Sequence, residues 1–128
     1  MKYYFEKITD YTFEEAIDRV TEELKKEGFG VLTEIDVTGT FKQKLNVDFY
    51  NYRILGACNP SFAYKALLAE NKVGTMLPCN VVVQEREIGK VEISAVNPLA
   101  SMQSIDNTDL KEIIEEIEIK LESVINRV

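Results

Sequence analysis

The sequence contains no histidine and no tryptophan, and it has only two cysteines and three prolines among 128 residues. Without histidine, the chain lacks the side chain that most often serves as a general base, a metal ligand or a switch near neutral pH. Catalysis would therefore depend on a carboxylate, a thiolate, a lysine or a tyrosine. We identify no catalytic residue, no metal site and no cofactor in the sequence, which favours a protein that is not an enzyme.

Long apolar runs and an excess of basic residues are also absent. No apolar run approaches the roughly 20 residues that cross a bilayer, and the N-terminal stretch does not have the pattern of a signal peptide. The formal net charge of −7 opposes binding to the phosphates of a nucleic acid. Two cysteines in a cytosolic chain are expected to be reduced. We therefore expect a cytoplasmic protein without a nucleic-acid or membrane partner.

The chain has the length and composition of one globular unit. At 128 residues, of which 45% are hydrophobic, it can bury a core without a disulfide or a structural metal. We find no repeat, low-complexity tract or linker. We therefore predict a single domain over residues 1–128.

Two stretches predict helices with one buried face. Thr12 begins a capping box, and apolar residues then recur at helical spacing until Gly28, which predicts a helix over residues 12–27. Near the end of the chain, either Asp106 or Thr108 can cap a second long helix. The apolar stripe of that helix consists of Leu110, Ile113, Ile114, Ile117, Leu121, Val124, Ile125 and Val128.

The other periodic stretches are short. Alternating apolar residues predict strands over 2–8, 29–37, 50–57, 81–86 and 91–96, and helical spacing predicts short helices over 38–46 and 60–71. Within 29–37, one side of the strand is expected to carry Phe29, Val31, Thr33, Ile35 and Val37. Helices and strands are mixed, and the last two strands form a hairpin. This order predicts an α+β fold in which a curved, mainly antiparallel sheet is covered by helices.

Each cysteine is followed by an asparagine at a predicted change of secondary structure. Cys58-Asn59-Pro60 ends a strand and begins a helix, and Pro78-Cys79-Asn80 begins the next strand. If these strands run antiparallel as neighbours or next-neighbours, the end of one faces the start of the other. We therefore expect the two thiols to lie near one another, flanked by both asparagines. The candidate ligand-binding residues are Cys58, Asn59, Pro60, Pro78, Cys79 and Asn80.

The same motifs resemble a known family. Cys58-Asn59-Pro60, Leu77-Pro78-Cys79-Asn80 and Ala95-Val96-Asn97-Pro98-Leu99 are similar to motifs of the bacterial and archaeal family called domain of unknown function 302, and the similarity extends over nearly the whole chain. The resemblance implies a compact α+β fold related to half of a TATA-binding-protein saddle, usually as a homodimer. It implies no established activity and no catalytic residue.

Three functions remain open. The first is a homodimeric small-ligand-binding or regulatory module with its site around the two Cys-Asn motifs. The second is a thiol-based enzyme or redox protein, because Cys58 precedes a helix N-terminus that can lower its pKa and Cys79 could act as a resolving thiol. The third is a purely structural interaction domain, in which Asn59 only caps a helix and the cysteines only fill space.

The expected homodimer rests on the resemblance and on three apolar residues. Tyr50 and Tyr52 fall in or beside a predicted strand, and Ile119 lies among glutamates about half a turn away from Leu110 around the last helix. A single exposed isoleucine is common on protein surfaces, so the two tyrosines are the stronger signal.

Overall fold

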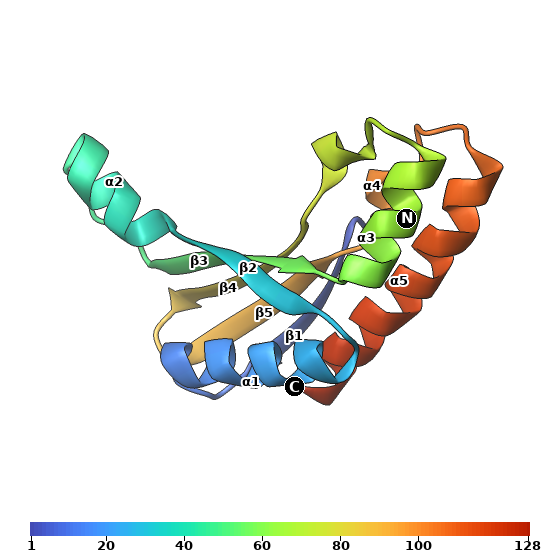
Figure 1. Ribbon diagram of the computed structural model, residues 1–128. Helices are drawn as coiled ribbons and strands as arrows, with labels where there is room; N and C mark the ends of the chain where they lie inside the picture. The colour runs from blue at the N-terminus through green and yellow to red at the C-terminus, as the bar shows by residue number, and fades with distance from the viewer.

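The computed structural model describes residues 1–128 and contains one five-stranded sheet with two long helices against one of its faces (Figure 1). The spatial order of the strands is β1-β5-β4-β3-β2, and every neighbouring pair is antiparallel. The α+β class and the antiparallel sheet predicted from the sequence are thereby confirmed. The strands are β1 (Tyr4–Thr9), β2 (Gly30–Asp36), β3 (Asn51–Cys58), β4 (Cys79–Glu87) and β5 (Lys90–Val96).

The helices differ in what they contact. Helices α1 and α5 lie against the sheet, and α3 lies beside α5, whereas α2 contacts only the end of the sheet near β3. No helix is both long and apolar enough to cross a membrane. The helical elements are α1 (Phe13–Lys26), α2 (Val37–Leu45), α3 (Pro60–Ala69), the 3₁₀ turn η1 (Val73–Met76), α4 (Pro98–Ser101) and α5 (Thr108–Arg127).

Helix α1 begins and ends as its sequence predicts. The Thr12 hydroxyl accepts a hydrogen bond from the Glu15 amide, and the Glu15 carboxylate accepts one from the Thr12 amide, both at 3.2 Å. At the other end, Gly28 has a φ of +86°, which allows the Phe29 amide to donate to the Leu24 carbonyl at 2.9 Å. These caps fix where the chain turns towards β2.

The cap of α5 differs from the prediction by one residue. Asn107, rather than Asp106 or Thr108, precedes the helix and accepts a hydrogen bond from the Leu110 amide at 3.2 Å. Its amide group also donates to the Ala69 carbonyl at 2.8 Å. A carboxylate could not donate this second bond, whereas the amide group of Asn107 connects the start of α5 to the end of α3.

A bulge in β2 breaks the predicted alternation. Val31 and Thr33 pair with consecutive residues of β3, which leaves Leu32 without a partner in the register. Val31 therefore faces the helices, whereas Thr33 and Ile35 face the opposite side of the sheet. Val37 lies outside the strand altogether, because α2 begins there. The prediction that one face carries all these side chains is wrong.

The sheet has one covered face and one open face. On β4, Val81 and Val83 are fully buried against the helices, whereas Val82 and Gln84 alternate with them and point to the other side. We call this other side, which also carries Tyr52, the open face. The core against the covered face includes Val20 and Leu24 of α1 and Leu121, Val124 and Ile125 of α5.

Helix α5 should contribute strongly to stability through its buried stripe. Leu121 is fully buried in the core, whereas Ile119 on the same helix is 64% exposed. We expect Leu121→Ala to lower the free energy of unfolding by about 2–5 kcal/mol, because it leaves a cavity in the core. The matched variant Ile119→Ala should change it by less than about 0.5 kcal/mol. Urea denaturation followed by circular dichroism measures both, and equal losses would contradict the assignment of the faces.

Candidate functional site

A cavity of about 360 Å³ lies between α3, the first half of α5 and the end of the sheet where β3 stops and β4 begins. We call it the thiol cavity because both cysteines of the chain line it. Asn59 and Pro78 line it as well, so four of the six residues predicted from the sequence meet here. Its walls also include Phe29, Leu32, Ala57, Ala63, Ala66 and Ile114.

The register of β3 against β4 brings the two cysteines to neighbouring positions at the cavity. Ala57 pairs with Cys79, so Cys58 is one residue away from the partner of Cys79. The two groups interact electrostatically, since charge on Cys58 contributes to raising the pKa of Cys79. The predicted antiparallel neighbourhood of these strand ends is present in the structure. Both cysteines are free thiols.

Gly56 allows the following chain to pack closely against the end of β3. A Cβ atom on Gly56 would collide with the Thr33 hydroxyl and would lie 2.9 Å from Pro78 Cγ. Only glycine leaves room for both side chains above the strand. The absence of a side chain at Gly56 therefore sets how closely Pro78 approaches the sheet beside the cavity.

Asn59 is committed to the backbone. Its side-chain oxygen accepts a hydrogen bond from the Phe62 amide at 3.4 Å and so caps α3, while its amide group donates to the Glu27 carbonyl at 3.1 Å. The side chain therefore connects the end of α1 to the start of α3. Asn59 forms part of the cavity wall, but its hydrogen-bonding groups are used by the fold.

Two of the predicted site residues lie outside the cavity. Asn80 pairs with Gly56 and points to the open face, because successive side chains of a strand alternate between faces. Pro60 occupies the first turn of α3 and is exposed. The expectation that both asparagines flank the thiols is therefore corrected: Asn59 lies beside the cavity, and Asn80 lies on the other side of the sheet.

The two thiols differ in exposure. Cys79 is only 5% exposed, and burial, with a smaller effect from Cys58, raises the pKa of its thiol to about 11. Cys79 is therefore protonated at neutral pH, whereas Cys58 is half-buried. No group of three or more cysteine, aspartate or glutamate side chains is placed to hold a metal ion. The cavity thus presents the neutral Cys79 sulfur among apolar side chains.

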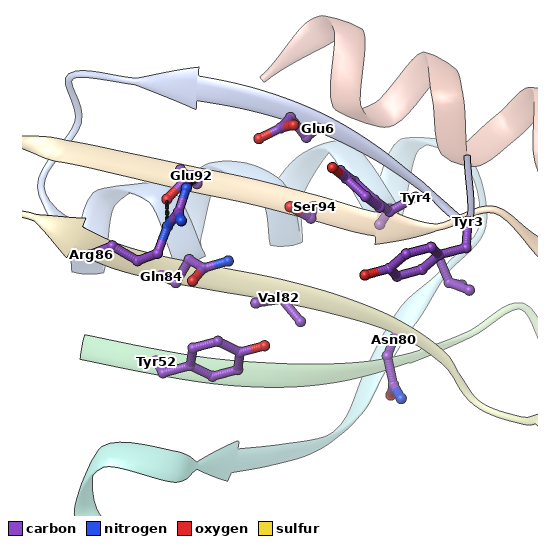
Figure 2. Close-up of a pocket in the computed structure, with 12 residues that line it drawn as sticks. Tyr3, Tyr4, Glu6, Tyr52, Asn80, Val82, Gln84, Arg86, Glu92 and Ser94 are labelled. Carbon is purple, nitrogen blue, oxygen red and sulfur yellow. Dashed lines mark hydrogen bonds and ion pairs between the residues drawn. The ribbon is translucent and has the colours of Figure 1, made fainter. Parts of the chain in front are cut away.

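A second hollow, of about 420 Å³, lies on the open face, as Figure 2 shows. Tyr4 and Tyr52 line it from β1 and β3. Arg86 donates two hydrogen bonds to the Glu92 carboxylate, at 2.7 and 2.8 Å, and these bonds lower the pKa of Glu92 although burial opposes them. The sequence predicted no site on this face, although polar residues alternate along the last two predicted strands and were a usable signal.

The comparisons with known proteins agree with the fold. The family described as domain of unknown function DUF302 matches residues 5–128. The chain belongs to this family. An uncharacterized conserved DUF302 protein from Bacillus stearothermophilus, known from a crystal structure, is 34% identical, with a TM-score of 0.90 over 99% of this chain and 98% of that one. No curated protein matches. The resemblance found in the sequence is confirmed, and DUF302 membership assigns no activity.

The buried thiol of this DUF302 protein should make its stability fall at alkaline pH. The pKa of Cys79 is about 11 in the folded state and 9.0 in an ordinary environment, so the unfolded chain loses this proton first as pH rises. Between these values, stability should fall by up to about 1.4 kcal/mol per pH unit from this group alone. Cys79→Ala should remove that component, whereas Cys58→Ala should keep it.

Urea denaturation at pH 8 and pH 10 provides the measurement. Because tyrosines also begin to ionise near pH 10, the informative quantity is the difference in alkaline loss between Cys79→Ala and the parent. Identical losses in the two proteins would contradict the burial of Cys79.

Proposed function

We propose that the protein is a homodimeric module that binds a small ligand, with a binding or regulatory role, in the thiol cavity. The observation that supports it is the cavity itself, whose volume of about 360 Å³ falls within the range of roughly 300–1,000 Å³ typical of small-molecule sites. Cys58 and Cys79 form part of its wall, beside the motifs that the sequence singles out. A cytoplasmic location fits the reduced thiols.

A thiol-based enzyme is supported less well. A nucleophilic cysteine needs a lowered pKa or an adjacent base, whereas burial raises the pKa of Cys79 to about 11. Cys58 precedes α3, but the Asn59 side chain already occupies the Phe62 amide at that helix start. Binding without chemistry is therefore the function that we favour.

The proposed dimer interface consists of the open face and the arm formed by α2 and residues 46–50. No residue of α2 is buried, and Figure 1 shows the helix projecting from the end of the sheet. The arm carries Leu45, which is 65% exposed, and three aromatic residues. The ring centroid of Phe49 lies 5.2 Å from that of Phe41 and 4.0 Å from that of Tyr50. A second copy related by a two-fold axis would cover this arm and the uncovered sheet together.

This interface includes two of the three residues that the sequence predicted at a dimer interface. Tyr50 and Tyr52 lie on the arm and the open face, where Tyr52 is 6.2 Å from Tyr50 between ring centroids. Ile119 lies on the outer surface of α5, in the helical layer on the other side of the sheet. One two-fold contact through the open face therefore leaves Ile119 in solvent, and we propose the interface without it.

The open face also supports the absence of a nucleic-acid partner. Arg86, which lies at the rim of its hollow, is already paired with Glu92, and the chain carries a net charge of −7. Unpaired basic side chains are what neutralise phosphates. We therefore propose that the single sheet and its helices resemble half of a TATA-binding-protein saddle, but that the protein does not bind DNA.

A ligand screen by thermal shift tests the binding function. A ligand should raise the melting temperature by an amount that grows with the logarithm of its excess, because it binds only the folded state. Cys79→Ser should weaken the effect, since it replaces a wall of the cavity, whereas Gln84→Ala on the open face should leave it unchanged. A flat response of the parent across metabolites, anions, metals and apolar compounds would count against a binding module.

The solution mass tests the dimer. Light scattering at micromolar concentration should give about twice the monomer mass of 14.6 kDa. Phe49→Asp should shift the mass towards the monomer, because a charge would be buried in the proposed interface. Ile119→Asp is the matched control, since Ile119 is 64% exposed on the outer surface of α5, outside the proposed interface. A parent mass near that of the monomer would refute the dimer.

A further inference from the structure

We infer that the thiol cavity takes a compact, uncharged, apolar molecule of about the size of two fused aromatic rings. This inference rests on the proposed function and adds the chemical class of the ligand. Of the 20 residues that line the cavity, 15 are hydrophobic, and none carries a charged side chain. An ionic ligand that entered would lose its hydration without gaining an opposite charge.

The few polar groups of the wall offer little to a polar ligand. The Asn59 side chain already donates to the Glu27 carbonyl and accepts from the Phe62 amide, so it and the Thr33 hydroxyl offer a ligand only a few remaining hydrogen bonds. Cys79 is a neutral, buried thiol, which is a weak donor and behaves as a small hydrophobic group. A ligand rich in hydroxyl or amide groups would therefore leave those groups unpaired in the cavity, at a cost that an apolar ligand avoids.

The size of the ligand follows from the volume. An apolar cavity of about 150 Å³ holds one benzene molecule, and the thiol cavity has a little more than twice that volume, about 360 Å³. Two fused rings, or an aliphatic molecule of similar bulk, would fill it. A nucleotide or another large cofactor would not fit within it.

The cavity lies where two apolar clusters are joined only through the partly buried Leu77 and Ile113. Ala57 belongs to the cluster between the sheet, α1 and α5, and Ala66 and Ile114 belong to a smaller cluster among α3, η1 and α5. Because alanine side chains line both sides of the gap, they are too short to fill it. Leu32 and Leu67 are the exposed apolar residues of the rim, 69% and 43% exposed, so a hydrophobic molecule meets apolar side chains from entry to floor.

A matched pair of probes tests the charge requirement. 1-Naphthol and 1-naphthoate share the ring system, but only the second is ionised at pH 7. We expect 1-naphthol to bind with saturation in calorimetry and 1-naphthoate to bind roughly tenfold more weakly or worse, a difference of about 1.4 kcal/mol or more. 1-Naphthol should also slow the alkylation of the half-buried Cys58 by iodoacetamide, which reports binding at this cavity. Equal affinity for both probes would overturn the requirement for an uncharged ligand.

Variants that fill the cavity test its location. Ala66→Leu should fill part of the space and weaken 1-naphthol binding at least tenfold without lowering the melting temperature, because added apolar bulk occupies an existing void. Ala63→Leu, at a half-buried position of the wall, provides a second variant if the first fails to fold. Tyr64→Leu is the control, since Tyr64 is exposed on the same helix and does not line the cavity. Unchanged binding in a folded filling variant would overturn the assignment.

The outcomes separate this inference from the proposed function. If a polar ligand gives saturable binding that the filling variants abolish, while 1-naphthol does not bind, the binding module stands and the apolar ligand class is wrong. If no probe and no metabolite binds the parent, both are wrong. Binding of 1-naphthol that protects Cys58 and is lost in the filling variants supports both.

Discussion

The pairing of Ala57 with Cys79 is the constraint on which the rest of the site depends. It places the end of β3 beside the start of β4, so that the chain leaves the sheet and returns to it at the same end. Helix α3 and the turn η1 are the excursion between these two points. Asn59 fixes the direction of that excursion through its two backbone hydrogen bonds. The thiol cavity is the space enclosed between this excursion, the sheet and α5.

Side-chain size explains why the cavity stays open at this end of the covered face. Beneath α1, Val20 and Leu24 fill the space against the sheet completely. Beneath α3, Ala57, Ala63 and Ala66 line the gap, and their methyl groups cannot span it. A void that larger side chains could fill lowers stability, by roughly 24 cal/mol for each Å³ that remains empty. A cavity that lowers stability and is nevertheless left unfilled is consistent with a role in ligand binding.

Local patterns predicted the elements well, and long-range geometry limited the prediction of the site. The capping box at Thr12 and the stop at Gly28 defined α1, because both depend on neighbouring residues alone. The bulge at Leu32 and the choice of Asn107 as a cap depend on partners far along the chain, so alternation and capping preference could not reveal them. The sequence could indicate that both cysteines lie near the junction of β3 and β4, because these strands are antiparallel neighbours. The position of Asn80 on the opposite face required the alternation along β4 to be extended to the residue after Cys79. The apolar cavity itself follows only from how α3, α5 and the end of the sheet pack around small side chains.

The central claim is that the space beside the two thiols holds an uncharged ligand. Nuclear Overhauser effects between 1-naphthol and the methyl groups of the protein test it most directly, since they are observed only between protons within about 5 Å of one another. Bound 1-naphthol should contact the methyl groups of Ala57, Ala66 and Ile114 in the thiol cavity, and not those of Val82 in the hollow of the open face. Contacts with Val82 alone, or with no methyl group at all, would contradict it.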